Sequence, residues 1–256
     1  MRTLLLAAGL GTRLQPITDL IPKCMAPIGG RPLIGIWLDK LFQVGVKDVL
    51  INTHYHHEMV ERYISDYYNA ANVTTVYESK LLGTAGTLLK NLDFFGSEDA
   101  LLIHADNYCL ESLDRLIVAH RLRPARCLCT MMTFRTPDPA SCGIVEVDEQ
   151  SVVRKFHEKV QDPPGNLANG AIYILSSEML KILGARFAAA RDFSLDIIPY
   201  FIGHIYIYET VEAFIDIGTP ERYHAANKYQ SALDQHKQVS APNYGDEILE
   251  SDVGSS

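Results

Sequence analysis

Short apolar segments alternate with amphipathic segments through the first half of this chain, and this alternation constrains the fold more than any other feature. The apolar segments, typical of strands buried on both faces, lie at residues 3–7, 48–51, 73–77, 100–103 and 127–133. Between them, residues 32–44, 57–68, 84–92 and 113–121 carry apolar side chains three and four positions apart, as helices do. The pattern predicts an α/β fold with a single doubly wound, mostly parallel (mixed) sheet flanked by helices.

Past residue 135 the alternation gives way to shorter segments, which we expect to join the same sheet. They predict a hairpin from residues 143–147 and 152–156, strands at 170–175, 205–208 and 213–217, and a helix at 194–201 capped by Ser194. The folded domain is therefore expected to span residues 1–229. After Lys228 the composition shifts to Gln, Ser, Asp and Gly, which predicts a fraying last helix and a flexible acidic tail over residues 230–256.

Composition and charge exclude several classes of function. The chain has 31 acidic against 23 basic residues and no basic block, so it is a poor candidate for binding nucleic acid. It has no apolar stretch long enough for a transmembrane helix, and no membrane partner is expected. The apolar run after Met1 is interrupted by Gly9, Gly11 and Arg13, unlike that of a signal peptide, so we expect a buried first strand and a cytoplasmic location.

A turn with two glycines directly follows the first predicted strand. Because Gly9 and Gly11 have no Cβ atom, backbone N–H groups there can approach phosphate oxygens closely. The turn matches neither a P-loop nor the Rossmann fingerprint, which needs a third glycine where Leu14 stands. A tight turn alone would explain the glycines nearly as well, but the cations Arg13 and Lys23 indicate an anionic ligand.

The segment LAAGLGTRLQPIT followed by PKCMAPIGGRPL resembles the signature loop of the sugar-1-phosphate nucleotidylyltransferases, and the resemblance extends over residues 1–228. It implies a Rossmann-like nucleotidyltransferase fold, with a nucleotide-binding half at about 1–135 and a sugar-binding half at about 136–229. Arg13 would neutralise the departing pyrophosphate and Lys23 would contact the nucleotide phosphates. The nucleotide-binding residues implied in this segment are Leu6, Ala8, Gly9, Gly11, Thr12, Arg13 and Lys23.

Further along, the family's base-binding and metal-binding segments have counterparts. In ESKLLGTAG, the resemblance implies that Gly83 and Thr84 present their backbone to the base and that Glu78 faces its hydrogen-bonding edge. HADN stands where the family commonly has Gly-Asp, and it implies that Asp106 binds Mg²⁺. His104 departs from that pattern, and we expect a buried structural histidine there.

The second half carries the family's sugar-phosphate segments, which imply a site made of Gly143, Glu158, Lys159, Asn169 and Gly170. In FHEK, Glu158 would hold sugar hydroxyls and Lys159 the sugar phosphate, while Cys142 replaces the family's aromatic residue. FIDIGTP resembles the segment that supplies the second magnesium ligand, here Asp216.

These residues suit attack by a sugar-phosphate oxygen on the α-phosphorus of a nucleoside triphosphate. The attacking monoester has a second pKa of about 6 and is already ionised near neutral pH, so no general base is needed. The protein has to align the reactants and stabilise charge. The catalytic set is Arg13, Lys23, Asp106 and Lys159, with Mg²⁺ as the cofactor on Asp106 and Asp216.

The substrates are expected to be a nucleoside triphosphate and a sugar 1-phosphate. A carboxylate at Glu78 can accept two hydrogen bonds from guanine but only one from thymine or uracil, which favours GTP. Several segments look similar to mannose and manno-heptose 1-phosphate guanylyltransferases. The alternatives are UTP, dTTP or CTP with another sugar 1-phosphate or a phosphocholine-like substrate, a non-catalytic regulatory homologue, or a metal-dependent glycosyltransferase. A homo-oligomer is left open.

Overall fold

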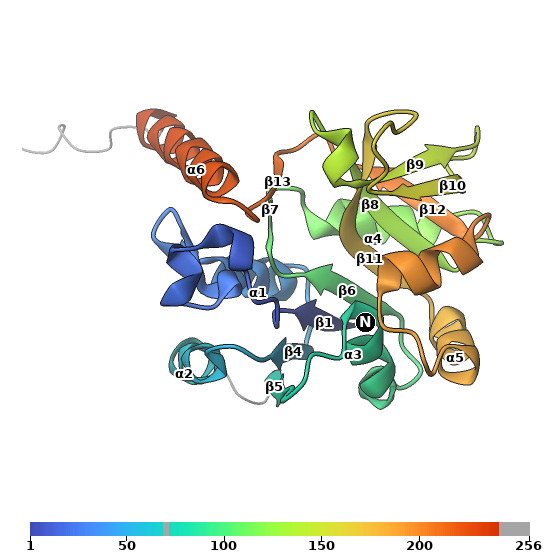
Figure 1. Cartoon of the computed structure of the whole chain (residues 1–256), viewed down its shortest axis with the longest axis horizontal. Coiled ribbons are helices and arrows are strands. Elements are labelled where there is room, and N and C mark those ends of the chain that lie inside the picture. Colours follow the sequence, from blue (N-terminus) through green and yellow to red (C-terminus); the bar gives the residue numbers. More distant parts are fainter. Residues whose placement is uncertain (69–71, 241–256) are drawn as a thin grey trace, which may run out of the picture.

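A central mixed sheet organises the computed structural model, which describes residues 1–68 and 72–240 (Figure 1). The first half contributes four of its strands: β1 (Arg2–Leu6), β4 (Val49–Thr53), β5 (Val73–Tyr77) and β6 (Ala100–His104). They pair in parallel in the order β6–β1–β4–β5. The connecting helices are α1 (Leu33–Gln43), α2 (His57–Tyr67), α3 (Thr84–Lys90) and α4 (Leu113–Leu122). Each of these elements confirms its prediction to within two residues at either end.

The second half extends the same sheet with antiparallel strands. It supplies β8 (Cys129–Arg135), β9 (Gly143–Val147), β10 (Val153–Glu158), β11 (Leu167–Leu175) and β12 (Ile205–Glu209). The long strand β11 runs antiparallel to β6 and also pairs with β8 and β9, so it joins the two halves. Within the described residues the result is a nine-stranded mixed sheet. The prediction that the strand at residues 213–217 joins this sheet is wrong, because in the part of the chain that the structure describes β13 (Phe214–Asp216) pairs only with β7 (Asn107–Cys109), in a separate two-stranded sheet.

Helices cover both faces of the sheet. Adjacent residues of a strand point to opposite faces, and accordingly Leu5 of β1 belongs to a core that contains Trp37 of α1 and Ile64 of α2. Leu4 belongs to the other core, with Leu88 of α3 and Leu183 of α5 (Ser177–Arg186). In Figure 1, α3 (teal) and α5 (orange) lie on the same side of the sheet although they are far apart in sequence. The predicted doubly wound arrangement is confirmed.

The predicted helix at residues 194–201 is wrong in type and in its cap. The chain forms a π-helical turn at Phe193–Ile197 and a 3₁₀ turn at Ile198–Phe201. Asp192, not Ser194, caps the first turn, because its carboxylate accepts a hydrogen bond from the Leu195 amide at 2.9 Å. Pro199 explains the irregularity, since proline has no N–H and its ring clashes with the preceding helical turn.

The last helix, α6 (Pro220–Ser240), continues beyond the predicted end of the folded domain. Gln230 explains part of this difference, since its side chain accepts a hydrogen bond from the Tyr108 hydroxyl and donates one to Asp234. The remainder of the predicted tail, residues 241–256, lies outside the described residues. In the part of the chain that the structure describes, no helix combines the length and apolar character needed to cross a membrane.

Candidate active site

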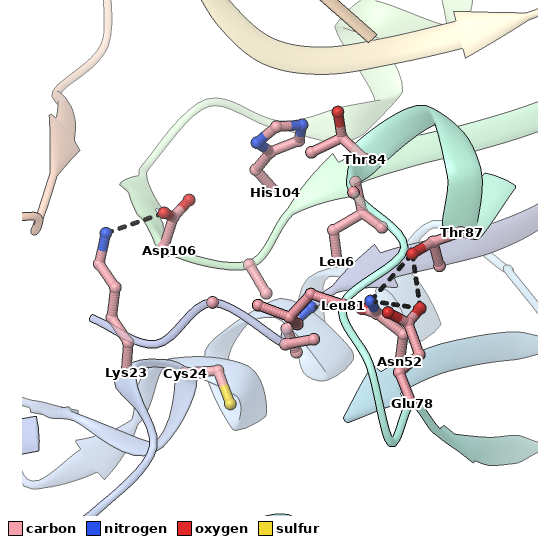
Figure 2. Close-up of a pocket in the computed structure, with 15 residues that line it drawn as sticks. Leu6, Lys23, Cys24, Asn52, Glu78, Leu81, Thr84, Thr87, His104 and Asp106 are labelled. Carbon is pink, nitrogen blue, oxygen red and sulfur yellow. Dashed lines mark hydrogen bonds and ion pairs between the residues drawn. The ribbon is translucent and has the colours of Figure 1, made fainter. Parts of the chain in front are cut away.

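A pocket of about 230 Å³ opens at the carboxyl ends of β1 and β6, the edge of an open α/β sheet where ligands commonly bind (Figure 2). Its walls come from the turn after β1, from the segment that leads into α3, and from the end of β6. Many of the predicted nucleotide-binding residues line it, namely Leu6, Ala8, Gly9, Lys23, Glu78, Gly83 and Thr84. Gly11, Thr12 and Arg13 lie in the same turn but outside the pocket wall.

The glycine turn uses its two glycines differently. Gly11 has φ +65°, and a Cβ atom there would come 2.7 Å from the Thr18 side chain and 3.1 Å from Cβ of Lys23. A glycine is therefore required to fold the turn back onto Lys23. Gly9 lines the pocket with no atom within 4 Å of the position of a Cβ, so its backbone is open to a ligand.

Lys23 brings together two carboxylates that are distant in sequence. Its Nζ atom lies 2.8 Å from Asp106 Oδ2 and 3.2 Å from Asp216 Oδ1. The lysine side chain is buried, whereas those of Asp106 and Asp216 are 40% and 32% exposed. Two partly open carboxylates at one point are the oxygen donor set that a divalent cation would use.

Pairing between two short strands explains why Asp216 lies beside Asp106. β7 (Asn107–Cys109) pairs antiparallel with β13 (Phe214–Asp216), and Asp216 stands opposite Asn107. The Ile217 amide also donates a hydrogen bond to the Asp106 carbonyl at 3.2 Å. The two predicted metal ligands are thus held side by side by main-chain contacts.

The mutual contacts keep these groups charged. Burial would lower the pKa of Lys23, but the two carboxylates outweigh it and raise the pKa above its ordinary value. Burial likewise favours the neutral form of Asp106, but the Lys23 ammonium outweighs it and lowers the pKa of that carboxyl. Lys23 therefore stays a cation and Asp106 an anion near neutral pH.

Two arginines stand around Asp216. Arg222, from the first turn of α6, has its Nη1 atom 3.7 Å from Asp216 Oδ2, and its Nη2 atom donates to Asp138 Oδ2 at 2.8 Å. Arg13 approaches from the glycine turn, because a Cβ atom built on Gly218 would lie 3.2 Å from Arg13 Nη2 and 3.0 Å from the Asp216 carboxylate. Positive charge from two elements therefore lies beside the carboxylates, where anionic phosphates would bind.

Glu78 lies under the pocket and is 3% exposed. Its Oε1 atom accepts hydrogen bonds from Asn52 Nδ2 at 3.1 Å and from Thr87 Oγ1 at 2.5 Å (Figure 2). Its Oε2 atom accepts one from the Leu82 amide at 3.0 Å. The prediction that Glu78 offers two hydrogen bonds to guanine does not fit these contacts, because both lone pairs of Oε1 are already engaged. Glu78 instead fixes the segment that leads into α3.

His104 contributes an uncommitted polar group to the same pocket. It lines the wall near Thr84 and Asp106, as Figure 2 shows. Its Nε2 atom is buried without a hydrogen-bond partner among the described residues. Burial lowers the pKa of the ring, which is therefore neutral near pH 7.

Among the predicted sugar-phosphate residues, Gly143, Glu158 and Lys159 meet on the β9–β10 hairpin, away from the pocket wall. Gly143 pairs with Glu158 across the hairpin, and Lys159 Nζ lies 3.4 Å from Glu158 Oε1. The Lys159 side chain is 66% exposed. Its ammonium is therefore accessible to an anionic ligand.

Asn169 and Gly170 lie on β11 at a shift in its pairing with β8. The Asn169 amide donates to the Tyr173 hydroxyl at 2.6 Å and accepts from the Ala171 amide at 2.9 Å. Its side chain thus stabilises the irregular strand. The Gly170 carbonyl accepts a hydrogen bond from Asn107, which follows Asp106, at 3.4 Å, so this strand contacts the carboxylate end of the site.

Sequence reasoning missed two residues of the site. Buried Asn52, at the end of β4, accepts a hydrogen bond from the Ala7 amide at 2.8 Å and donates to Glu78, so it connects the glycine turn to the base segment. A polar residue at the carboxyl end of an apolar strand was the available signal. Arg222 follows the Gly-Thr-Pro segment closely, but its contact with Asp216 depends on the docking of α6.

Comparisons with known proteins show the family of the chain. A family model described as "Nucleotidyl transferase" matches residues 2–232. A Campylobacter jejuni D-glycero-α-D-manno-heptose 1-phosphate guanylyltransferase is 31% identical over 88% of this chain and 97% of its own length. A mannose-1-phosphate guanyltransferase of Schizosaccharomyces pombe is 27% identical over 94% of this chain and 68% of its own.

A solved structure agrees on the fold. It is a Bacillus anthracis protein described as a glucose-1-phosphate thymidylyltransferase in complex with sucrose, with a TM-score of 0.80, 23% identity, and coverage of 90% of this chain and 95% of the other. The predicted Rossmann-like nucleotidyltransferase fold is confirmed. The chain belongs to the nucleotidyl transferase family, within which its motifs match the sugar-1-phosphate nucleotidylyltransferases.

Proposed function

We propose that this chain joins a nucleoside triphosphate, with GTP favoured, to a sugar 1-phosphate of the mannose or manno-heptose type, giving a nucleotide sugar and pyrophosphate. The observation that carries the proposal is the meeting of Lys23, Asp106 and Asp216 at one side of a pocket whose other side is the predicted base segment. The names of the two relatives described above support GTP and a manno-configured sugar.

In the proposed reaction an oxygen of the sugar phosphate attacks the α-phosphorus, and the bond from that phosphorus to pyrophosphate breaks. Lys23 stabilises the nucleotide phosphates, and Arg13 stabilises the charge that grows on the leaving pyrophosphate. Lys159 holds the incoming phosphate in line for attack. Asn52 and Glu78 do not react, and their contribution is to hold the glycine turn and the base segment in place.

Magnesium is the proposed cofactor, and the donor set of the site fits it. Mg²⁺ prefers oxygen ligands and commonly takes one or two carboxylates together with water and substrate phosphates. Asp106 and Asp216 would hold it, since both are partly exposed and already converge on one cation. When bound, the ion would supply charge neutralisation across the phosphates.

The base preference rests on the relatives and not on Glu78, whose acceptors are largely engaged. A neutral ring at His104 and the backbone of Gly83 and Thr84 are the remaining groups of the pocket that could contact the nucleoside. They do not by themselves exclude UTP, dTTP or CTP, so the choice of base has to be measured.

The test is a substrate matrix read by pyrophosphate release. Each of GTP, ATP, UTP, CTP and dTTP is paired with mannose 1-phosphate, a manno-heptose 1-phosphate, glucose 1-phosphate and phosphocholine, with Mg²⁺ and with EDTA. We expect the highest kcat/KM for GTP with a manno-configured sugar, and no turnover in EDTA. Asp216→Asn should lower kcat at least about 100-fold, the range typical of removing one group that stabilises transition-state charge. Absence of pyrophosphate release from every pair would contradict the proposed reaction, and a preference for UTP would contradict only the base.

A further inference from the structure

The segment predicted to bind the base is held from outside the pocket by hydrogen bonds to a segment of the second half of the fold. We call residues 81–86 the base loop and residues 190–193 the strap. Arg191 Nη2 donates a hydrogen bond to the Leu81 carbonyl at 2.9 Å. The Arg191 carbonyl accepts hydrogen bonds from the amides of Ala85 at 2.9 Å and Gly86 at 3.5 Å. Arg191 therefore holds both ends of the base loop.

A second contact adds to this grip. The Phe193 amide donates to Thr84 Oγ1 at 2.8 Å, and the Phe193 side chain is buried. The approach of the two segments is close, since a Cβ atom on Gly83 would lie 2.3 Å from the Arg191 carbonyl oxygen. Gly83 also has φ +83°, so both its conformation and its neighbour require glycine.

The strap is itself anchored in the second half of the fold. Asp196 Oδ2 accepts hydrogen bonds from the amides of Arg191 at 2.8 Å and Asp192 at 2.9 Å. These two amides lower the pKa of Asp196, which therefore stays ionised near neutral pH. The next turn is fixed by the buried side chain of Ile197. The strap is thus fixed in place before it contacts the base loop, with the Arg191 carbonyl as its hydrogen-bond acceptor and the Arg191 guanidinium and Phe193 amide as its donors.

The inner side of the base loop is held independently of the strap, because Glu78 Oε2 accepts a hydrogen bond from the Leu82 amide. The loop therefore lies between a buried carboxylate that belongs to the nucleotide half and an exposed arginine that belongs to the other half. Arg191 does not line the pocket and would touch no part of a nucleotide in it.

We propose that Arg191 is a positioning residue for the nucleotide base, which acts through its hydrogen bonds to both ends of the base loop. The inference rests on the proposed function in one respect, namely that the base binds beside Gly83 and Thr84. Loss of the guanidinium frees the Leu81 carbonyl, so the first end of the base loop loses its outer contact, while the main-chain contacts of the strap at Thr84, Ala85 and Gly86 remain. Among the described residues, no hydrogen bond or ion pair joins the strap to the phosphate end of the site at Lys23 and the glycine turn, so that end should not respond.

The experiment compares Arg191→Ala with a matched control, Arg186→Ala. Arg186 is also exposed, lies five residues earlier, and donates to the Tyr200 hydroxyl at 3.3 Å, with no hydrogen bond to the base loop among the described residues. We expect Arg191→Ala to raise KM for the nucleoside triphosphate roughly 3- to 10-fold, as the net loss of one hydrogen bond would. Both kcat and KM for the sugar phosphate should stay at the values of the control.

Inhibition by inorganic triphosphate separates base positioning from general loosening. This probe has phosphates but no base, so its inhibition constant should be the same in both variants. Amide hydrogen exchange gives a readout that needs no turnover, and the amides of residues 81–86 should exchange faster in Arg191→Ala than in Arg186→Ala.

Three results would overturn the inference: equal nucleotide KM in the two variants, an equal loss of triphosphate inhibition and nucleotide affinity, or unchanged exchange in the base loop. Wild-type protein that releases no pyrophosphate from any substrate pair would instead contradict the proposed function. In that case the hydrogen-exchange comparison still decides whether Arg191 holds the loop.

Discussion

Replacing Lys23 with methionine should destabilise the protein in the absence of divalent cations and make its stability respond to magnesium. Methionine keeps the length and much of the volume of the buried stem but removes the ammonium between Asp106 and Asp216, which leaves Arg222 at 3.7 Å as the nearest cation to Asp216. Each contacts the same nitrogen, at 2.8 and 3.2 Å, so the two oxygens lie close together.

The distances set the size of the effect. Two oxygens that contact one nitrogen at 2.8 and 3.2 Å lie at most about 6 Å apart, and like charges at that limit repel by about 3 kcal/mol at an effective dielectric constant of 20 and by about 0.7 kcal/mol in water. Because the two carboxylate side chains are 40% and 32% exposed, solvent screening places the cost between these limits. A cost of about 1–2 kcal/mol lowers Tm by roughly 2–6 °C in a protein of this size.

Thermal unfolding in EDTA and in Mg²⁺ measures both parts of the prediction. Lys23→Met should lose stability in EDTA and regain it with Mg²⁺, because an ion that binds only the folded state stabilises that state. Lys23→Met combined with Asp216→Asn is the control, since the amide removes the repulsion and one metal ligand. A wild-type Tm for Lys23→Met in EDTA, or an equal response of the double variant to Mg²⁺, would refute the reasoning.

Three further predictions concern other parts of the molecule. Lys159→Ala should raise KM for the sugar 1-phosphate more than KM for the nucleotide, and equal effects on both substrates in steady-state kinetics would contradict its assignment. Gly83→Ala should raise nucleotide KM and lower Tm, because a strained φ costs about 1–3 kcal/mol and the new Cβ would meet the Arg191 carbonyl; unchanged values of both would count against the close approach. Burial lowers the pKa of His120 in the folded state, so the unfolded chain takes up its proton first, near pH 6.5, and the free energy of unfolding should fall as pH drops below that value. Urea unfolding between pH 7 and pH 5 should show a weaker pH dependence in His120→Gln, and the same dependence in both proteins would refute this.

The parallel half of the fold was predictable because its signals are local. Each strand is a short apolar run and each helix a period of three to four residues, and both survive in the structure with small shifts at their ends. The irregular turn at residues 193–201 was harder, because apolar spacing indicates a helix there while Pro199 prevents a regular one. A single proline can therefore override the helix that the apolar spacing predicts.

The identity of the site residues was more predictable than their contacts. The order of the motifs along the chain identified Lys23, Asp106 and Asp216 as candidate site residues. In the structure these three side chains are in contact. The partners of Glu78 depend on the register of β4 against β5 and on where α3 begins, neither of which a motif encodes. The hydrogen bond from Arg191 to the Leu81 carbonyl joins residues 110 positions apart, and no local sequence pattern indicates it.

The pairing of β7 with β13 also determines when the site is completed as the chain folds. Lys23 and Asp106 emerge early in synthesis, but Asp216 reaches them only when β13 docks, across a separation of 193 residues from Lys23. Contacts of such long sequence separation form late, since the entropy of closing the intervening chain has to be overcome first. A nascent or partly folded chain therefore carries the glycine turn without the complete pair of carboxylates, and under the proposed function it would bind nucleotide before it can consume it.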